Sequence, residues 1–357
     1  ARHDLKFEHG KVIRRRPLDS LFGRLASASL GTKFLAASLL SAAVILLIAS
    51  YLIGSHLTRM LDDNARGQLS HEVALLRAAV SSRIDNVSVE AEEHAKILAE
   101  LITRELGSTR QINRKNFSAL LNDPARNSKI TSHLKGLHGF GTLFMLTPEG
   151  FQRRLSTIRD ERGQPATGTI LNTSHPAIAP LLAGRSYRGP ARIFGRQYIT
   201  HYIPLFDPTG EVIGAVGIGI DIEEQLASLK TQVRTMQVGN SGYYYIIDVT
   251  PGDYFGQLIL HPFKEGRNLS EFRIGDKEYL VSEMVRLRQG EISYNWQNEE
   301  AGETAPRRKH VVFETLDTPR WVIAGGTTVE EFTALTQSVV WAVILGDIRY
   351  EDARQAV

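Results

Sequence analysis

The stretch GEVIGAVGIGIDIEEQL, Gly210–Leu226, decides which kind of fold the chain adopts. A dinucleotide-binding fingerprint has the order G-x-G-x-x-G at the turn between a strand and a helix. Here the order is G-x-x-G-x-G, and the glycines lie inside the strand pattern. The stretch therefore predicts a β-strand followed by a helix, and not a phosphate-binding loop.

Alternation divides this predicted strand into two unlike faces. The mostly bulky face carries Val212, Gly214, Val216, Ile218 and Ile220. The mostly small face carries Ile213, Ala215, Gly217, Gly219 and Asp221. Small side chains leave room on a sheet, so the second face is predicted to receive either a closely packed helix or a ligand.

Other strands are predicted around this one. A strand over residues 197–205 is joined to it by Phe206-Asp-Pro-Thr-Gly210, a hairpin signal that makes the sheet antiparallel. Two earlier strands are predicted over residues 142–146 and 151–158. A second set follows over residues 242–248, 258–261, 291–297, 310–314 and 321–325.

The two sets of strands end alike. Residues 219–224 read GIDIEE and residues 326–331 read GTTVEE. In each, a strand ends at a helix-capping residue, Asp221 or Thr328, with a glutamate three positions later, which is the pattern of a capping box. The chain is therefore predicted to contain two copies of one unit, an antiparallel sheet followed by a helix.

Composition limits the class of protein. The chain has 357 residues, no cysteine and a formal net charge of +3. This length suffices for two domains, and the absence of cysteine excludes disulfides, cysteine metal sites and thiol nucleophiles. The net charge is too small to indicate a nucleic-acid partner.

Residues 34–55 read FLAASLLSAAVILLIASYLIGS and contain no charge. A helix of this length rises about 33 Å, enough to cross a hydrocarbon core of about 30 Å. A buried core helix and a cleaved signal peptide are alternatives, but core helices are rarely apolar all round and signal peptides are shorter. Lysine and arginine exceed acidic residues before this run, so the residues after about 56 are predicted to lie outside the inner membrane.

A second membrane span is nearly present. Ser338–Gly346 reads SVVWAVILG, and Asp347 then ends the uncharged run. Even counted back to Phe332, the run is shorter than the roughly 20 residues that a span needs. The chain either crosses the membrane once or is a truncated or altered form of a two-span protein, and the second interpretation is favoured.

A long helix is predicted from Leu57 to about Leu106, because this segment has no proline and a single glycine. Its apolar seam is Leu69, Val73, Leu76, Val80, Ile84, Val87, Ala91, His94, Leu98 and Leu101. A helix of about 75 Å is longer than a compact domain uses alone, so we expect it to pair with a second copy of the chain. His94 is interpreted as a packed core histidine.

Several short motifs follow one another in a specific order between Leu57 and Leu335. Those of the first unit are Arg154–Thr157, Gly168–Thr169, Gly184–Gly189, Gly195–Pro204 and Asp207–Gly214. Those of the second are Gly239–Tyr243, His261–Pro262, Gly266–Asn268, Trp296 and Trp321–Ile323. In this order they resemble the extracytoplasmic Cache sensor modules of bacterial chemoreceptors (methyl-accepting chemotaxis proteins) and sensor kinases, in the form that fuses a Cache three unit to a Cache two unit.

The resemblance implies an α+β fold in which a long N-terminal transmembrane and stalk helix precedes two tandem PAS-like antiparallel sheets. It also implies a parallel homodimer. The expected parts are a cytoplasmic N-terminus (1–33), a transmembrane helix (34–55), a stalk helix (56–107), a membrane-distal Cache domain (108–222), a linker helix (223–237), a membrane-proximal Cache domain (238–328), a helix leading to an incomplete second span (329–346) and a tail (347–357). No output domain can be read after Gly346.

In the family the distal domain usually holds a ligand against its sheet. The candidate ligand-binding residues are Arg154, Ser156, Thr157, Tyr187, Tyr198, Thr200, Tyr202 and Asp221, with Thr169 as a weaker candidate. Alternation is predicted to place Arg154 and Ser156 on one face of their strand, and the side chains at 198, 200 and 202 on one face of theirs. An arginine fork beside hydroxyl groups suits a small carboxylate. Asp221 is interpreted first as a helix cap and second as an acceptor for a ligand amine.

The second unit offers weaker candidates. Tyr243, Tyr245, His261 and Trp296 could line a second pocket, although core packing is the favoured interpretation for Trp296. An enzyme is not expected, because the sequence has no nucleophile elbow, no P-loop and no histidine spacing that suits zinc on a helix. We therefore expect neither a metal nor a cofactor.

The expected function is ligand sensing for chemotaxis by a membrane-anchored receptor. Its partners would be a small polar ligand such as an organic anion or amino acid, the membrane, and a second copy in a parallel homodimer, with no nucleic acid. Two alternatives stay open. The chain could be the input region of a sensor histidine kinase or cyclase, or a single-span structural or adaptor protein without a small ligand.

Overall fold

The structure is a computed structural model that describes residues 7–8, 11–12, 29–105, 113–135, 138–275 and 278–331. It divides into two units, residues 1–65 with 333–357, and residues 66–332. The predicted near-span at Ser338–Gly346 and the predicted tail lie outside the described residues, as does most of the predicted basic N-terminus.

The described part of the first unit contains a short strand pair and the start of a long helix. Strand β1 (Phe7–Glu8) pairs antiparallel with β2 (Lys11–Val12). Helix α2 (Leu30–Glu105) begins in this unit and continues into the second. Among the described residues it is the one helix long and apolar enough to cross a membrane, and large apolar side chains such as Phe34, Leu47 and Tyr51 are exposed on it.

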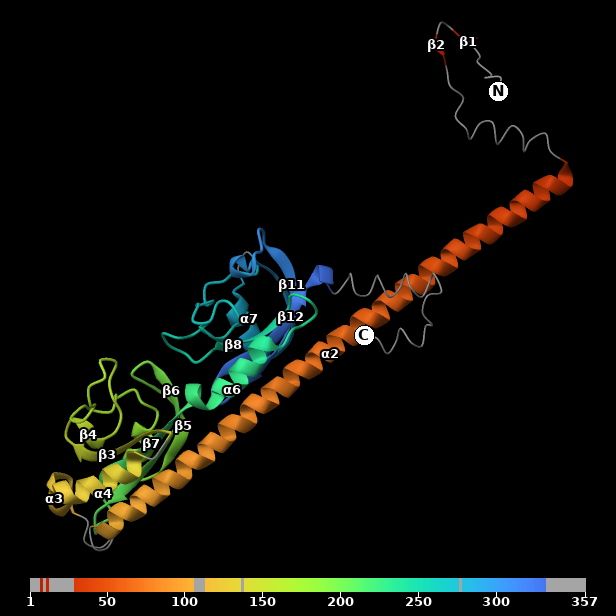
Figure 1. Cartoon of the computed structure of the whole chain (residues 1–357). Coiled ribbons are helices and arrows are strands. Elements are labelled where there is room, and N and C mark those ends of the chain that lie inside the picture. The colour runs from red at the N-terminus through yellow and green to blue at the C-terminus, as the bar shows by residue number, and fades with distance from the viewer. Residues whose placement is uncertain are drawn as a thin grey trace. The chain divides into compact units, whose positions relative to one another are not determined.

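In the second unit, α2 runs beside two sheets, as Figure 1 shows. Its buried positions are Leu69, Val73, Leu76, Val80, Ile84, Val87, Ala91, Ala95, Leu98 and Ile102. They share one core with apolar residues of both sheets. The predicted seam is therefore right as far as Ala91, and it then passes through Ala95 and Ile102 instead of His94 and Leu101.

The spacing of the buried positions explains this drift. Steps of four, three and four residues repeat along α2, which keeps one stripe aligned on a straight helix. The stripe is buried by the same chain, because both sheets pack onto it. This apolar seam is already covered by the two sheets of the same chain, so it does not test whether α2 pairs with a second copy. That pairing stays a prediction.

The first sheet has the strand order β4-β3-β7-β6-β5 and is antiparallel throughout. Its strands are β3 (Gly139–Thr147), β4 (Gly150–Ser156), β5 (Tyr187–Ile193), β6 (Arg196–Phe206) and β7 (Val212–Asp221). Its helices are α3 (Arg114–Asn122), α4 (Pro124–Lys135) and α5 (Ile178–Leu182). Helix α6 (Ile222–Thr235) leads from β7 to the second sheet.

The second sheet has the order β10-β11-β12-β8-β9. Its strands are β8 (Tyr243–Asp248), β9 (Leu258–Leu260), β10 (Gln289–Trp296), β11 (Arg307–Leu316) and β12 (Trp321–Thr328). Helix α7 (Leu280–Leu287) and the short helix η2 (Glu299–Ala301) complete this part. When the strands are numbered within each sheet, both sheets have the order 2-1-5-4-3 or its reverse. This confirms the predicted repeat and the α+β fold of a long helix with two antiparallel sheets.

The short helices α3 and α4 were not expected from the sequence, which predicted no helix between residue 107 and the strands of the first sheet. Their few apolar residues, Phe117, Leu120 and Ile130 among them, are fully buried in the core that α2 shares with both sheets. Strand β5 was not expected as a strand either. It carries glycine and proline, Gly189 and Pro190, which weaken a strand pattern.

Strand β7 lies at the centre of the first sheet, between β3 and β6. Its residues Val216, Ile218 and Ile220 face the α2 core, as the alternation predicts. The prediction is wrong at the start of the strand. Ile213 belongs to the α2 core and Val212 packs on the opposite side, because the register between β6 and β7 shifts at Leu205/Phe206.

On the small face of β7, the space beside the glycines is neither covered by a helix nor left open for a ligand. Tyr202 lies directly across from Gly217, and Phe140 directly across from Gly219. A Cβ atom would lie 2.7 Å from the Tyr202 ring at Gly217 and 2.3 Å from the Phe140 ring at Gly219. The glycines are therefore needed so that aromatic rings of the neighbouring strands can cover β7.

Candidate ligand-binding site

The face of the first sheet that is turned away from α2 carries two neighbouring polar regions. One, which we call the buried cluster, consists of the buried Arg153 and Tyr202 with the half-buried His175 and Tyr187. The other is an open cavity at the corner where β7 ends and β6 begins. Phe194 connects them, because its ring lies 5.8 Å from the Arg153 guanidinium carbon and also lines the cavity.

Arg153 is the charged member of the buried cluster, and only 4% of it is exposed. It is positioned by β4, whose backbone at this residue bonds to Thr169 O and Gly168 N. One guanidinium nitrogen donates to Thr169 Oγ1 at 2.9 Å and to Ile170 O at 3.2 Å. Its Nε has no partner, and no carboxylate among the described residues lies within ion-pair distance of it. Burial of such a cation without an anion is costly.

Two further polar atoms of the cluster are buried without a partner among the residues that the structure describes, namely His175 Nε2 and the Tyr202 hydroxyl. The His175 ring stacks edge-on against Tyr202, with the ring centroids 5.2 Å apart, and lies 6.2 Å from Tyr187. Buried polar groups in proteins usually have hydrogen-bond partners. Three unsatisfied polar atoms on neighbouring side chains therefore indicate a place where a polar ligand or ordered water completes the bonding.

Burial also sets the protonation of these groups. It lowers the pKa of His175 to about 4, with a smaller contribution from the positive charge of Arg153, so the ring is neutral at pH 7. Burial raises the pKa of the Tyr202 phenol and, less strongly, that of the Tyr187 phenol. Desolvation lowers the pKa of Arg153, which nevertheless stays charged. The cluster thus has one positive charge and several neutral hydrogen-bonding groups.

The open cavity has a volume of about 700 Å³. It is lined by His138, Gly139, Phe140, Thr157, Ile158, Arg159, Asp160, Glu161, Phe194, Arg196, Tyr198, Asp221 and Glu224. Charges of both signs reach it, in contrast to the single positive charge of the buried cluster. Its size suits a small organic molecule.

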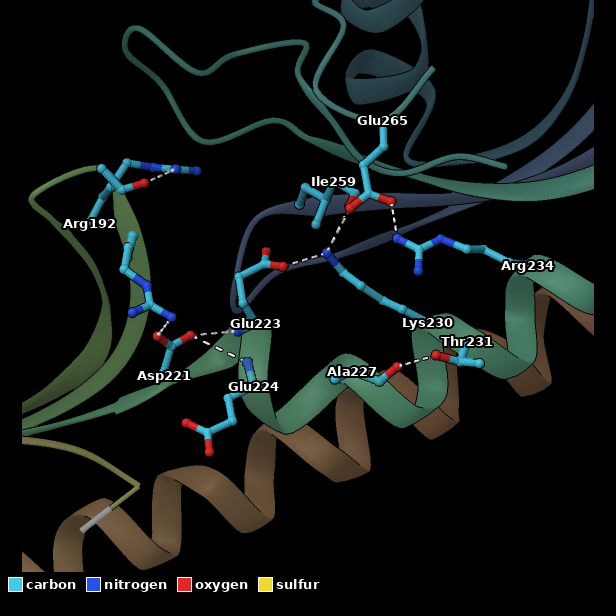
Figure 2. A network of polar contacts seen from close by, with 12 residues as sticks. Arg192, Asp221, Glu223, Glu224, Ala227, Lys230, Thr231, Arg234, Ile259 and Glu265 are labelled. Carbon is cyan, nitrogen blue, oxygen red and sulfur yellow. Dashed lines mark hydrogen bonds and ion pairs between the residues drawn. The ribbon is translucent and has the colours of Figure 1, made fainter. Parts of the chain in front are cut away.

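Asp221 is the buried carboxylate at the cavity. Its Oδ2 pairs with Arg196 Nη2 at 2.6 Å, and its Oδ1 accepts from the backbone N–H groups of Glu223 and Glu224 (Figure 2). It therefore caps α6, as predicted. The reciprocal half of the predicted capping box is not formed, because the Asp221 N–H donates to His138 O.

Helix α6 continues from Asp221 to the second sheet domain. Its Lys230 is buried, and the ammonium group donates to Glu223 at 2.6 Å and to the carbonyl of Ile259 in β9 at 2.9 Å. Glu265 accepts from Lys230 at 3.4 Å and pairs with Arg234 at 2.5 Å (Figure 2). The helix that Asp221 caps is thus bonded directly to the second domain.

The structure places Arg154 away from the other predicted residues. Its guanidinium contacts the sulfur of Met145 at 3.8 Å, and Met145 packs against the α2 core. The cause is a register shift between β3 and β4 at Leu143/Phe144, which interrupts the alternation of β4. The prediction that Arg154 shares a face with Tyr202 is therefore wrong, and the neighbouring Arg153 lies there instead.

The remaining predicted residues fall into three groups. Thr157, Tyr198 and Asp221 line the open cavity, while Tyr187 and Tyr202 belong to the buried cluster. Thr200 and Ser156 are committed to other bonds: the Thr200 hydroxyl donates to Gly189 O at 2.9 Å, and Ser156 bonds to Thr142 at 2.6 Å. Thr169, the weaker candidate, accepts from Arg153.

Sequence reasoning missed Arg153, His175, Phe194 and Arg196. Arg153 stands beside Arg154, and only the register shift shows which of the two is buried. His175 lies in a loop without a strand pattern, so nothing in the sequence predicts its direction. Arg196 could have been found from the hairpin, since β6 begins two residues before Tyr198, which pairs with Asp221 at the end of β7.

Comparison with known proteins agrees with this architecture. Residues 55–341 match the family described as the Cache 3/Cache 2 fusion domain, and the chain belongs to that family. A comparison with curated proteins finds no match.

Three similar solved structures are sensory domains. The periplasmic sensory domain of the Campylobacter jejuni chemoreceptor Tlp1 is 12% identical, with 75% of this chain and 98% of that one covered and a TM-score of 0.45. The ligand-binding domain of Mlp24 with asparagine is 14% identical, with 78% and 98% covered and a TM-score of 0.43. The ligand-binding domain of the Pseudomonas aeruginosa amino acid chemoreceptor PctC with GABA is 15% identical, with 74% and 99% covered and a TM-score of 0.38.

Proposed function

We propose that the first sheet domain senses a small organic anion, and that Arg153 binds the carboxylate of this ligand. The observation that carries the proposal is the buried Arg153, which has no anionic partner among the described residues. An arginine fork binds a carboxylate through two parallel hydrogen bonds, which would use the free Nε. The Tyr202 hydroxyl and His175 Nε2 supply further hydrogen-bonding groups beside it.

The open cavity gives such a ligand its route to the cluster. Phe194 lies between the cavity and Arg153, and a rotation of its side chain would join the two regions. Asp221 and Glu224 at the cavity could accept a ligand ammonium group, so amino acids belong to the proposed ligand class beside organic acids. This extends the role of Asp221, whose carboxylate already caps α6.

Helix α6 offers the path by which binding changes the second domain. A ligand that competes with Arg196 for Asp221 would alter the N-terminus of α6, and Lys230 on this helix bonds to the second domain. We propose a shift between two packings of the sheets on α2, with the ligand preferring one of them. Movement of the helix after Thr328 would carry the signal toward the membrane.

The proposed setting is a receptor of the bacterial inner membrane. Residues 34–55 would cross the membrane, and the domains expected over residues 108–222 and 238–328 would lie in the periplasm as distal and proximal domains of a parallel homodimer. Family membership and the exposed apolar stretch of α2 support this arrangement. Chemotaxis is the proposed output, and no enzymatic activity is proposed.

A thermal-shift screen tests the proposal. The full chain, solubilised in detergent, is melted with organic acids, amino acids and, as a contrasting class, amines without a carboxylate. A ligand at 100 times its dissociation constant should add about 2.7 kcal/mol to the free energy of unfolding, a shift of several degrees. Stabilisation by carboxylates but not by amines alone is expected. A well-folded protein that no carboxylate stabilises would contradict the proposal and favour a partner-binding module.

A further inference from the structure

The second sheet domain has a polar corner at the same place as the open cavity of the first. With the strands of each sheet numbered in chain order, this corner is the place where the side chain of the first residue of the fourth strand contacts that of the last residue of the fifth. In the first domain Arg196 pairs with Asp221 at 2.6 Å. In the second, Arg307 donates from Nη2 to Thr328 Oγ1 at 2.8 Å. The two arginine contacts are therefore equivalent, although the acceptor differs.

Two substitutions between these corners change the charge in the same direction. The buried carboxylate of Asp221 is replaced by the neutral Thr328. Two residues after each arginine, Tyr198 of the first domain is replaced by Lys309 of the second. The second corner thus loses a negative charge and gains a positive one at a buried position.

Lys309 is buried to an unusual degree for a lysine, with 2% of it exposed, and its Nζ has no hydrogen-bond partner in the part of the chain that the structure describes. The nitrogen lies 3.7 Å from the centre of the Tyr243 ring. Nearby carboxylates are used elsewhere: Glu303 accepts from Asn298 N at 2.5 Å, and Glu331 accepts from Ser241 N at 3.1 Å. A buried ammonium with only an aromatic face as its partner indicates a missing anion.

Aromatic rings and further cations surround this ammonium group. Asn298 holds Trp296 and Tyr243 together, since it accepts from the indole and donates to the phenol. Arg267 and Lys264 lie 5.6 and 5.8 Å from the Trp296 ring. Burial and these cations lower the pKa of the neighbouring His261 to about 3, so that ring adds no positive charge at neutral pH.

We propose that this second corner, defined as Tyr243, His261, Trp296 and Lys309, is a second ligand site that binds a small oxyanion. The oxyanion would pair with Lys309, and a flat organic group would fit among the rings of Tyr243 and Trp296. Phe263 covers the corner: its ring contacts Tyr243 and His261, and 45% of the residue is exposed. Displacement of this side chain would open the site.

The charge of Lys309 makes binding depend on pH. Burial lowers its pKa to about 8, with Arg307 acting in the same direction and Glu303 and Glu331 in the opposite one. A bound anion would raise this pKa. Affinity for an anion should therefore fall as pH rises from 7 to 9.5, whereas carboxylate groups stay ionised throughout this range.

The test is a fluorescence titration of the full chain with inorganic phosphate and with benzoate. Trp296 reports on the corner, and Trp296→Phe identifies its share of the signal. We expect a saturable change at pH 7 with either probe, and at least tenfold weaker binding of both probes by Lys309→Met at pH 7. At pH 9.5 we expect at least tenfold weaker binding of benzoate, whose charge is constant over this range. The matched control is Arg308→Met, because Arg308 is the exposed neighbour and should leave binding unchanged.

The first domain must be kept out of the measurement, so the titration is repeated in an Arg153→Met background, where the Trp296 signal should persist. Lys309→Arg should retain binding, which separates loss of charge from loss of fold. No saturable Trp296 signal with either probe would overturn the proposal. So would wild-type affinity in Lys309→Met, or an affinity independent of pH.

Discussion

In the first sheet domain the fifth strand ends at Asp221, and in the second it ends at Thr328. The strand orders are equivalent, and each of these residues contacts the arginine that begins the fourth strand, Asp221 through an ion pair and Thr328 as a hydrogen-bond acceptor. The surroundings are opposite in charge. The first corner holds a buried carboxylate beside an open cavity, while the second holds a buried ammonium beneath aromatic rings.

This comparison separates what the fold determines from what single residues determine. The repeated sheet fixes where a ligand can lie, on the face that α2 does not cover. The charge of a few inward side chains then selects the ligand. A buried positive charge that has no anionic partner within the described ranges occurs in both domains, at Arg153 and at Lys309, but at different positions on the sheet.

The largest expected effect compares two buried rings. Phe144 and Phe313 are both fully buried on the faces away from α2. Phe144→Ala and Phe313→Ala should each lower the free energy of unfolding by about 3–5 kcal/mol, because each leaves a cavity. Only Phe144, whose ring lies 5.3 Å from the Arg153 guanidinium carbon, should also change affinity for the carboxylate ligand. Equal loss of ligand affinity in both variants would contradict the claim that the carboxylate site belongs to the first domain.

Acid should destabilise the folded chain through His175. Its pKa is lowered to about 4 in the folded state, mainly by burial, so the unfolded chain binds more protons between pH 6.5 and 4. Stability should therefore be intact above pH 6.5 and fall, by up to about 3 kcal/mol from this group, as pH drops to 4. Melting curves of the wild type and His175→Phe at pH 7 and 4.5 measure the difference.

The control for this prediction lies in the second domain, where the pKa of His261 is lowered to about 3. His261→Phe should also reduce the acid sensitivity. A carboxylate bound near His175 should raise the pKa of that ring, so binding at pH 5 should take up protons in the wild type and in His261→Phe but not in His175→Phe. Calorimetric titration in two buffers of different ionisation enthalpy would show this.

A smaller effect is expected when the second corner is made to resemble the first. Thr328→Asp would place a carboxylate next to Arg307, near Lys309. This internal anion should compete with phosphate and weaken its binding about tenfold, which corresponds to about 1.4 kcal/mol. Thr328→Asn is the uncharged control and should retain binding. Unchanged phosphate affinity in Thr328→Asp would show that the corner does not select by charge.

The smallest effect concerns the bond between the domains. Glu265 accepts from Lys230 and Arg234 of α6. The side chains of Glu265 and Arg234 are substantially exposed, whereas Lys230 is buried. Glu265→Gln should therefore cost less than about 1 kcal/mol of stability. It should nevertheless weaken the effect of a first-domain ligand on the second domain, measured as ligand-induced change in Trp296 fluorescence. The exposed pair Arg288–Asp317 includes no residue of α6, and Asp317→Asn should leave that change intact.

Much of this architecture could be predicted from particular residues. Alternation and turn residues marked nine of the ten strands in the two sheets, and GIDIEE with GTTVEE indicated the repeat that the strand orders confirm. The three-and-four spacing from Leu69 to Ala91 predicted the buried stripe of α2. What covers that stripe could not be predicted, because a periodic apolar stripe looks the same whether a second helix or a sheet covers it.

The candidate site was predictable only where strands are regular. Tyr198 and Tyr202 were placed on the correct face because β6 alternates without interruption through them. Arg154 was chosen over Arg153 because regular alternation assigns every second residue of a strand to the same face. The register shift between β3 and β4 moves that assignment by one residue, so Arg153 takes the place expected for Arg154. The charge difference between the corners needed the strand order as well, since Tyr198 and Lys309 correspond only after the two sheets are matched.

The most direct test of the account is calorimetric titration of one carboxylate identified in the thermal-shift screen against Arg153→Ala and Arg154→Ala. The two arginines are adjacent in sequence and identical in chemistry, but only Arg153 is buried beside Tyr202 and His175. The account predicts at least a hundredfold loss of affinity in Arg153→Ala and less than a twofold change in Arg154→Ala. Equal losses in both variants, or a loss confined to Arg154→Ala, would contradict it.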